Sequence, residues 1–276
     1  MLGVFAAMND HLLEELLRAR QTRTLCALAT VAATTGSVPR QTGSKMLVYS
    51  DGKVSGTIGG GKFEALVVEE CLKSIATKEP MLKTYPLRED KPDSFGAICG
   101  GEVTVMIEPQ NLNTALYLIG GGHCSRAIAK LAVDCGMHVT VVEDRAEQLE
   151  NFPTPINRVV ENAPAFISGR EWRGDEALVL VSRNHELDRN ALAAALKKSG
   201  IGYIGMIGSR RKVNRVFDAL KQAVPVEQLS KVYAPLGLDI GADSPAEIAI
   251  SVIAEILQVQ RGRKGGHLRL ANDHSS

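Results

Sequence analysis

ALYLIGGGHCSRAIAK, residues 115–130, is the stretch that decides the fold of this chain. Its apolar run at 116–119 predicts a strand, Gly120-Gly121-Gly122 predicts a tight turn, and the pattern that follows predicts a helix. Glycines allow the backbone to approach a ligand closely, and the free N–H groups at a helix start favour an anion. The stretch therefore predicts a phosphate-binding turn for a nucleotide-like ligand; the alternative is a βα turn with nothing bound.

Two features around this turn bear on a dinucleotide. The fingerprint reads Gly120-x-Gly122-x-x-Ser125, in which a small serine stands where a third glycine is usual and still allows the helix to pack closely on the strand. Glu143 and Asp144 come 23 and 24 residues after Gly120, close to where an acidic group would meet a ribose hydroxyl. A solvated pair of acids at a strand end is the alternative interpretation.

The second half of the chain alternates strand and helix patterns. Such alternation predicts an α/β fold with a parallel sheet and right-handed crossovers, which is a Rossmann-like architecture. The last helix has a full capping box, with Ser244 as the cap, Pro245 in the first turn and Glu247 three residues after the cap. The predicted elements are strands 115–119, 138–143, 156–160, 177–182 and 202–207 and helices 123–135, 186–198, 209–222 and 244–260.

The first half predicts a separate α+β domain with an antiparallel hairpin. Asp51-Gly52 between two apolar runs is a strong signal for a two-residue hairpin turn. We therefore expect an N-terminal domain at 1–110, a polar boundary at 109–114, a Rossmann-like domain at 115–262 and a flexible tail at 263–276. The predicted elements are a helix from Asn9 or Asp10 to Arg20, strands 25–33, 45–50, 53–58, 81–87 and 102–108, and helix 62–76.

Composition excludes several classes of protein. The 276 residues, of which 45% are hydrophobic, suffice for about two folded domains. A formal net charge of +1 gives no bulk attraction to nucleic acid or membrane, so any anion site must be local. The five cysteines form no CxxC pair, which argues against a disulfide framework or a four-cysteine zinc site. Without a basic leader or a run of about 18 apolar residues, we expect a cytoplasmic protein.

Three further loops are candidate anion sites. The first contains Ser37 and Arg40, a hydroxyl and a cation after a buried strand, and the second is the glycine run Gly59 to Gly61 before a helix. In the third, Ser209 can cap a helix whose first turn contains three cations: Arg210, Arg211 and Lys212. Cations at a helix start oppose the macrodipole unless something negative compensates, so this conflict predicts a bound phosphate. A solvent-facing basic turn is the alternative.

Single side chains offer weaker signals. Cys99 precedes two glycines, where access is good, and could be a thiolate ligand to a metal or a sulfur carrier; a buried inert cysteine is the default. His123 follows the glycine turn and either contacts a ligand or caps the helix. A metal site built from His123, Cys124, His185 and Asp188 has no supporting spacing motif.

The order of these motifs resembles the XdhC/CoxI family of xanthine dehydrogenase accessory proteins. The resemblance covers nearly the whole chain, with departures at Cys124, where an aliphatic residue is common, and at Ser125, often glycine. The motifs are TTGSVPR at 34–40, GSKM at 43–46, GTIGGG at 56–61 with Glu64, CGG at 99–101, IGGGH at 119–123, EDR at 143–145, YIGMIGSRRK at 203–212, PLGLDIGA at 235–242 and PAEIA at 245–249.

The resemblance implies a non-catalytic chaperone and insertase for the molybdenum cofactor. Such a factor binds molybdopterin, supports its sulfuration by a cysteine desulfurase and hands it to an apo-molybdenum hydroxylase of the xanthine dehydrogenase type; we expect a homo-oligomer. The cofactor is expected between the domains, with Cys99 as a metal ligand. The expected cofactor-binding residues are Ser37, Arg40, Gly59, Gly60, Gly61, Cys99, Gly120, Gly122, His123, Glu143, Asp144, Ser209, Arg210, Arg211 and Lys212.

An NAD(P)-dependent oxidoreductase is the alternative function, because a nucleotide such as NAD(P) could occupy the Rossmann half. Against it, the sequence near the glycine turn contains no Tyr-x-x-x-Lys pair or other hydride-transfer constellation.

Overall fold

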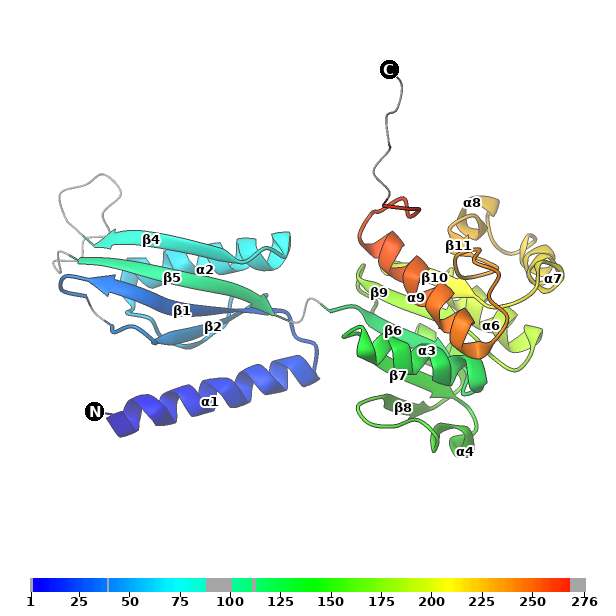
Figure 1. Ribbon diagram of the computed structural model, residues 1–276, viewed down its shortest axis with the longest axis horizontal. Helices are drawn as coiled ribbons and strands as arrows, with labels where there is room; N and C mark the ends of the chain where they lie inside the picture. Colours follow the sequence, from blue (N-terminus) through cyan, green and yellow to red (C-terminus); the bar gives the residue numbers. More distant parts are fainter. Residues whose placement is uncertain (1, 39, 88–100, 111–112, 269–276) are drawn as a thin grey trace, which may run out of the picture. The chain divides into compact units, whose positions relative to one another are not determined.

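The computed structural model describes residues 2–38, 40–87, 101–110 and 113–268. The chain divides into two compact units, Met1–Leu112 and Asn113–Ser276, each with its own sheet (Figure 1). Among the described residues, no helix combines the length and the apolar character needed to cross a bilayer.

The N-terminal unit is a five-stranded antiparallel sheet between two helices. Its strand order is β3-β2-β1-β5-β4. Side chains of α2 such as Phe63 and Val67 pack on one face of the sheet, and α1 covers part of the other through Leu12 and Leu16. The elements are α1 (Leu2–Gln21), β1 (Cys26–Thr35), β2 (Lys45–Tyr49), β3 (Val54–Gly56), α2 (Gly61–Thr77), β4 (Met81–Leu87) and β5 (Gly101–Gln110).

Several boundaries in this unit differ from prediction, among them the start of α1 and the end of β1. The first helix begins at Leu2, so the cap predicted at Asn9 or Asp10 is wrong. Residues 2–8 contain no proline, and a capping residue does not end a helix when the chain before it can also be helical. β1 continues to Thr35, beyond the predicted end, because Thr35 pairs with Glu102 of β5. Long-range pairing therefore sets the end of this strand.

The C-terminal unit is a six-stranded sheet in the order β11-β10-β9-β6-β7-β8, and its strand pairs are parallel. The predicted Rossmann-like fold is thus confirmed. The strand order reverses between β6 and β9, and such a reversal is where open α/β sheets collect ligands. The strands are β6 (Ala115–Ile119), β7 (His138–Glu143), β8 (Asn157–Val160), β9 (Glu176–Leu180), β10 (Ile201–Met206) and β11 (Val232–Tyr233).

Helices cover both faces of this sheet. α3 and α9 pack on the side of Leu116 and Leu118, while α5, α6 and α7 pack on the side of Tyr117 and Ile119. The capping box predicted for the last helix is present, since Glu247 N–H donates to Ser244 and Ser244 N–H donates to Glu247. The helices are α3 (His123–Asp134), α4 (Ala146–Leu149), α5 (Ala163–Ser168), α6 (His185–Ala195), α7 (Arg210–Leu220), α8 (Val226–Leu229) and α9 (Pro245–Gln260).

The sequence did not predict α4, α5, α8 or β11. These elements have two to six residues each, too few for a hydrophobic period to show. The irregular segment after β11 folds back on α9, where Gly237 (φ +98°) lies so close that an added Cβ would be 2.3 Å from Ser251 Oγ. Only glycine fits this approach.

Candidate functional site

The glycine turn lies at the switch point of the parallel sheet. Gly120 has φ +120°, and a Cβ there would lie 2.5 Å from the carbonyl oxygen of Val181, which follows β9. Gly122 is the cap of α3, makes no side-chain cap hydrogen bond and faces open space. His123 is exposed beside it. The turn therefore has the predicted shape, with its open side at Gly122 and His123.

The middle donor of this turn is already used by the protein. Gly121 N–H donates to Glu143 Oε2 at 2.8 Å, and the Glu143 side chain is only 3% exposed. α4 also closes on the turn, because a Cβ on Gly121 would lie 2.9 Å from Cβ of Gln148. A carboxylate of the chain itself thus occupies part of the predicted anion position.

The two acids at the end of β7 are held by two arginines. Arg145 Nε lies 2.9 Å from Glu143 Oε1, and Arg183 lies 3.0 Å from the same oxygen. Arg183 also binds both oxygens of Asp144, at 2.7 and 3.0 Å. The hydrogen-bonded Arg183 guanidinium holds the pKa of Asp144 well below its usual range. In the sequence, Arg183 stands out as a cation shortly after a strand at the switch point. The sequence does not show which acids it pairs with.

A basic groove lies at the same carboxyl edge of the sheet, between the starts of α6 and α7. Its volume is about 510 Å³. Arg210, Arg211 and Arg215 are exposed, and the described part of the chain gives them no ion pair. The groove is lined by Arg183, Asn184, His185, Ser209, Arg211, Lys212 and Arg215.

Lys212 differs from its neighbours on this helix. Its Nζ lies 2.6 Å from Asp188 Oδ2 and 3.1 Å from the carbonyl oxygen of Ile207. Asp188 is fully buried and also accepts the Ser182 N–H at 3.1 Å. Asp188 therefore compensates the positive charge of Lys212 at the helix start, and only the arginines of this helix still favour an external anion.

Ser209 caps α7 as predicted, accepting the Lys212 N–H at 3.3 Å. Arg210 is exposed on the same turn but does not line the groove. Of the four predicted residues at 209–212, the structure thus places Ser209, Arg211 and Lys212 at the groove. His185 and Arg215 also line the groove, and Arg215 was not predicted because it lies one helical turn after the motif.

The glycine loop of the N-terminal unit, like the glycine turn at Gly121, donates hydrogen bonds to a carboxylate of the protein itself. Glu64 Oε2 accepts the Gly60 N–H at 3.0 Å and the Thr57 hydroxyl at 2.6 Å. Gly60 and Gly61 have φ of +78° and +66° and open space beside them. The loop has the predicted conformation, and Glu64 takes three of its donors, the N–H groups of Gly60 and Ile58 and the Thr57 hydroxyl.

The structure describes some of the other predicted site residues of this unit and not others. Ser37 and Arg40 are exposed in the connection between β1 and β2. Cys99 lies outside the described residues, so its predicted role as a ligand or sulfur carrier stays a prediction. The predicted placement of a cofactor between the two domains also stays a prediction.

Four cysteines can be placed. Burial raises the pKa of Cys26 to about 11 and that of Cys71 to about 12, which makes both thiols inert. Cys124 packs against the core beneath α3, and Cys135 is exposed. Within the described residues, no three His, Cys, Asp or Glu side chains gather around a point where a metal ion could sit.

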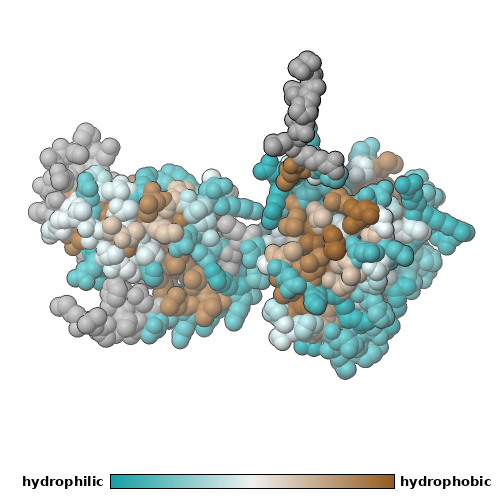
Figure 2. Space-filling view, viewed as in Figure 1, coloured by the Kyte–Doolittle hydropathy of each residue, from teal (hydrophilic) through white to brown (hydrophobic). Residues whose placement is uncertain are grey.

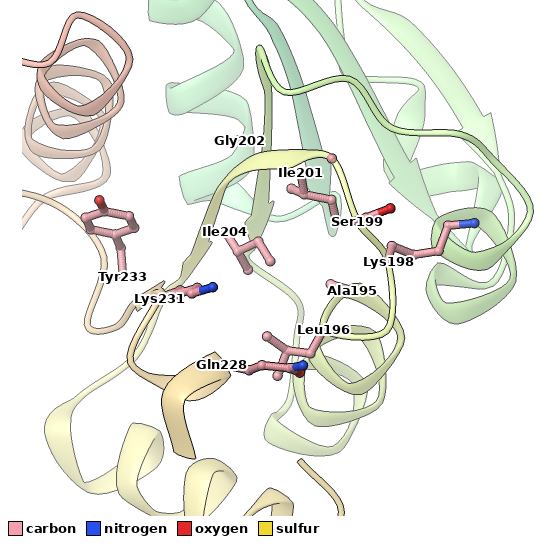
Figure 3. Close-up of a pocket in the computed structure, with 11 residues that line it drawn as sticks. Ala195, Leu196, Lys198, Ser199, Ile201, Gly202, Ile204, Gln228, Lys231 and Tyr233 are labelled. Carbon is pink, nitrogen blue, oxygen red and sulfur yellow. The ribbon is translucent and has the colours of Figure 1, made fainter. Parts of the chain in front are cut away.

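A second hollow lies at the opposite end of the strands (Figure 3). It has a volume of about 480 Å³ and is walled by the end of α6, the start of β10 and the segment around Gln228 and Lys231. Lys198, on its rim, donates to the carbonyl oxygen of Ser168. Ligands of open parallel sheets collect at the carboxyl ends of the strands, so the basic groove is the stronger candidate.

Two family models match the chain. The model of the XdhC Rossmann domain matches residues 116–256, and that of the XdhC and CoxI family matches residues 19–86. The chain belongs to the XdhC and CoxI family. The resemblance predicted from the ordered motifs is thereby confirmed, and both the basic groove and the glycine turn fall within the XdhC Rossmann match.

Two curated relatives of this XdhC-family chain are longer than it is. The uncharacterized protein YqeB of Escherichia coli K12 is 37% identical over 254 residues, which are 91% of this chain and 46% of that protein. A protein of Bacillus subtilis 168, described as a probable component of xanthine dehydrogenase, is 29% identical over 157 residues, 56% of this chain and 44% of that protein. The chain thus spans about half the length of the curated relatives it matches.

A crystal structure described as a xanthine dehydrogenase from Bacillus halodurans is also similar. It superposes with a TM-score of 0.49 at 22% identity and covers 91% of this chain and 96% of that one.

Proposed function

We propose that this XdhC-family chain is a maturation factor for a molybdenum hydroxylase of the xanthine dehydrogenase type. It binds the molybdenum cofactor as cargo, supports its sulfuration by a cysteine desulfurase and inserts it into the apo-enzyme in the cytoplasm. Family membership supports the link to xanthine dehydrogenase. The observation that supports cofactor binding is the basic groove, where exposed arginines have no ion pair within the described part of the chain.

The groove suits the phosphate of molybdopterin. Arg211 and Arg215 are four residues apart on α7, so their side chains lie on one face of the helix. A guanidinium presents a planar set of donors that matches phosphate oxygens, and the positive end of the helix dipole adds to the attraction. The volume of about 510 Å³ is within the usual range for small-molecule sites.

The double variant Arg211→Ala/Arg215→Ala tests the groove. It removes two guanidinium groups that could each form a charge-assisted hydrogen bond with phosphate, so we expect molybdopterin to bind about 100-fold more weakly. The measurement is titration with molybdopterin, followed by gel filtration and fluorescence of the oxidised pterin. Lys197→Ala, an exposed cation beyond the far end of α6, is the control and should bind like the wild type. Equal affinity in the double variant and the wild type would reject the groove as the cargo site.

Cys99→Ser tests the sulfur role separately. If Cys99 carries sulfur or contacts molybdenum, a soft thiolate is required, because serine offers only a hard oxygen. We expect sulfuration of the hydroxylase to be lost while molybdopterin still binds. Sulfuration is read as cyanolysable sulfur in the hydroxylase after incubation with the desulfurase, and Cys135→Ser, an exposed thiol, is the control. Normal sulfuration by Cys99→Ser would leave Cys99 without this function.

Surface hydrophobicity is relevant to partners and to the predicted homo-oligomer. On the face shown in Figure 2, hydrophobic colour gathers where α9 lies in Figure 1. Ile250 of α9 and Ile240 just before it are 54% and 55% exposed. Exposed apolar groups of this kind are common where proteins associate, and the homo-oligomer stays a prediction.

The alternative function, an NAD(P)-dependent oxidoreductase, has one observation in its favour. The reversal of strand order at Gly120 is the position where dinucleotides bind in Rossmann domains. Tight binding of NAD(H) with turnover of a small carbonyl compound would support it. The arrangement of Arg183 bears directly on this alternative.

A further inference from the structure

Arg183 crosses the crevice in which a Rossmann domain holds the ribose of a dinucleotide. In such domains the acid at the end of the second strand binds a ribose hydroxyl, and the glycine turn faces the pyrophosphate. Here the acids at the end of the corresponding strand, β7, face an arginine from the far side of the switch point, 39 or 40 residues along the chain. The guanidinium therefore stands where the ribose hydroxyls would be.

Every carboxylate oxygen of this cluster already has at least one partner within the protein. Glu143 Oε1 binds Arg145 and Arg183, and Glu143 Oε2 accepts from Gly121 N–H and more distantly from Arg145. Both oxygens of Asp144 bind Arg183. Asp144 keeps further acceptor capacity on its exposed side, but a ribose that approached it would compete with Arg183 for both of its oxygens.

The enclosed space that remains in the crevice is too small for a nucleoside. The crevice bounded by Gly120, Asn162 and Arg183 has a volume of about 20 Å³. A single water needs roughly 10–15 Å³, so the enclosed part of the crevice holds about one water, and the rest is open to solvent. The side chain of Arg183 is 39% exposed, which means that the closure depends on a group at the surface and could be removed by mutation.

We propose that Arg183 is a specificity-determining residue that keeps nicotinamide dinucleotides out of the Rossmann crevice. The glycine turn of this chain then serves the fold and the neighbouring basic groove rather than a dinucleotide. This inference goes beyond the proposed maturation role and does not depend on it.

Charge argues against the opposite role, in which Arg183 would bind the 2′-phosphate of NADP(H). Two arginines and two acids make the cluster neutral in formal charge, and Glu161 also lines the crevice. A phosphate that drew Arg183 away would leave Asp144 and Glu143 next to its own negative charge. Neighbouring like charges repel, so binding of the 2′-phosphate next to Asp144 and Glu143 would not be favoured.

Titration with NADH and with ADP-ribose tests the proposal. For the wild type we expect no saturable binding up to about 1 mM, an affinity that would be negligible for a cofactor. Arg183→Ala should bind NADH at least tenfold more tightly than the wild type. NADH binding is measured by NADH fluorescence, and ADP-ribose binding by calorimetry. Arg183 also lines the basic groove, where its removal can only weaken anion binding, so a gain must come from the crevice.

Two controls make the result specific. Arg183→Ala/Asp144→Ala should lose the gain, because Asp144 supplies the acceptor for the ribose. Arg189→Ala, on α6 and outside the crevice, should behave like the wild type. Thermal unfolding checks that each protein is folded, and Arg183→Gln replaces Arg183→Ala if that variant is too unstable to titrate.

Either of two results would overturn the inference. The first is micromolar binding of NADH or NADPH by the wild type, which would make Arg183 a ligand or a bystander. The second is a folded Arg183 variant with no gain in NADH affinity.

Discussion

Replacing Lys212 by methionine should lower the free energy of unfolding of the C-terminal unit by about 3 kcal/mol, near the lower end of the range for breaking a buried ion pair. Asp188 is fully buried, and without Lys212 its carboxylate keeps only the Ser182 N–H among its described hydrogen bonds. The lower end of the range is appropriate because the Lys212 side chain is 25% exposed, so water can partly replace it. Urea unfolding followed by circular dichroism measures the change.

The same helix supplies the control. Lys221 pairs with Asp218 at 2.6 Å, but both side chains are more than half exposed. Lys221→Met should therefore change stability by less than about 1 kcal/mol. Adding Asp188→Asn to Lys212→Met should recover part of the loss, because the amide carries no charge and its oxygen can still accept the Ser182 N–H. Equal effects of Lys212→Met and Lys221→Met would contradict the buried pair.

Glu176→Ala should cost a similar amount, about 3 kcal/mol, because it leaves buried and partly buried donors without this acceptor. Glu176 is 1% exposed and accepts from Tyr117 hydroxyl, Arg170 and Arg173 N–H. The guanidinium of Arg170 lies 4.0 Å from the ring centre of Tyr117 and 4.6 Å from that of Trp172. Loss of the carboxylate would leave that cation held chiefly by aromatic faces.

Glu176→Gln separates charge from shape in this network. The amide can still accept one hydrogen bond, so its cost should be smaller than that of alanine. Glu171→Ala, an exposed acid in the loop before β9, should change stability by less than about 0.5 kcal/mol. The measurement is again urea unfolding, and a Glu176→Ala protein as stable as the wild type would show that the network contributes little.

Both glycine loops use a glutamate of the chain as an anion. Glu64 accepts the Gly60 N–H in the N-terminal unit, and Glu143 accepts the Gly121 N–H in the C-terminal unit. Free N–H groups at a helix start attract negative charge whatever its source. A strand-glycine-helix motif therefore predicts an anion position, but it does not tell whether a ligand or a carboxylate of the protein fills that position.

Local patterns predicted the elements with a long period and a clear cap. Strand 115–119, the glycine turn and the capping box at Ser244 are encoded by residues near one another in sequence, so their signals are readable there. Helix Leu2–Gln21 began earlier than predicted, because a capping residue inside a helical stretch gives the same local signal as one at its start. Four short elements gave no period at all.

The sequence by itself determined the α/β class, the antiparallel and Rossmann-like sheets, the family and the clustering of cations after Ser209. Tertiary structure alone decided which charges are free. Lys212 is neutralised by Asp188, 24 residues away, and Arg183 by Asp144, 39 residues away, while Arg211 and Arg215 have no ion pair in the described part of the chain. Strand order brings these partners together at one edge of the sheet, and hydrophobic periodicity carries no information on which loops meet there.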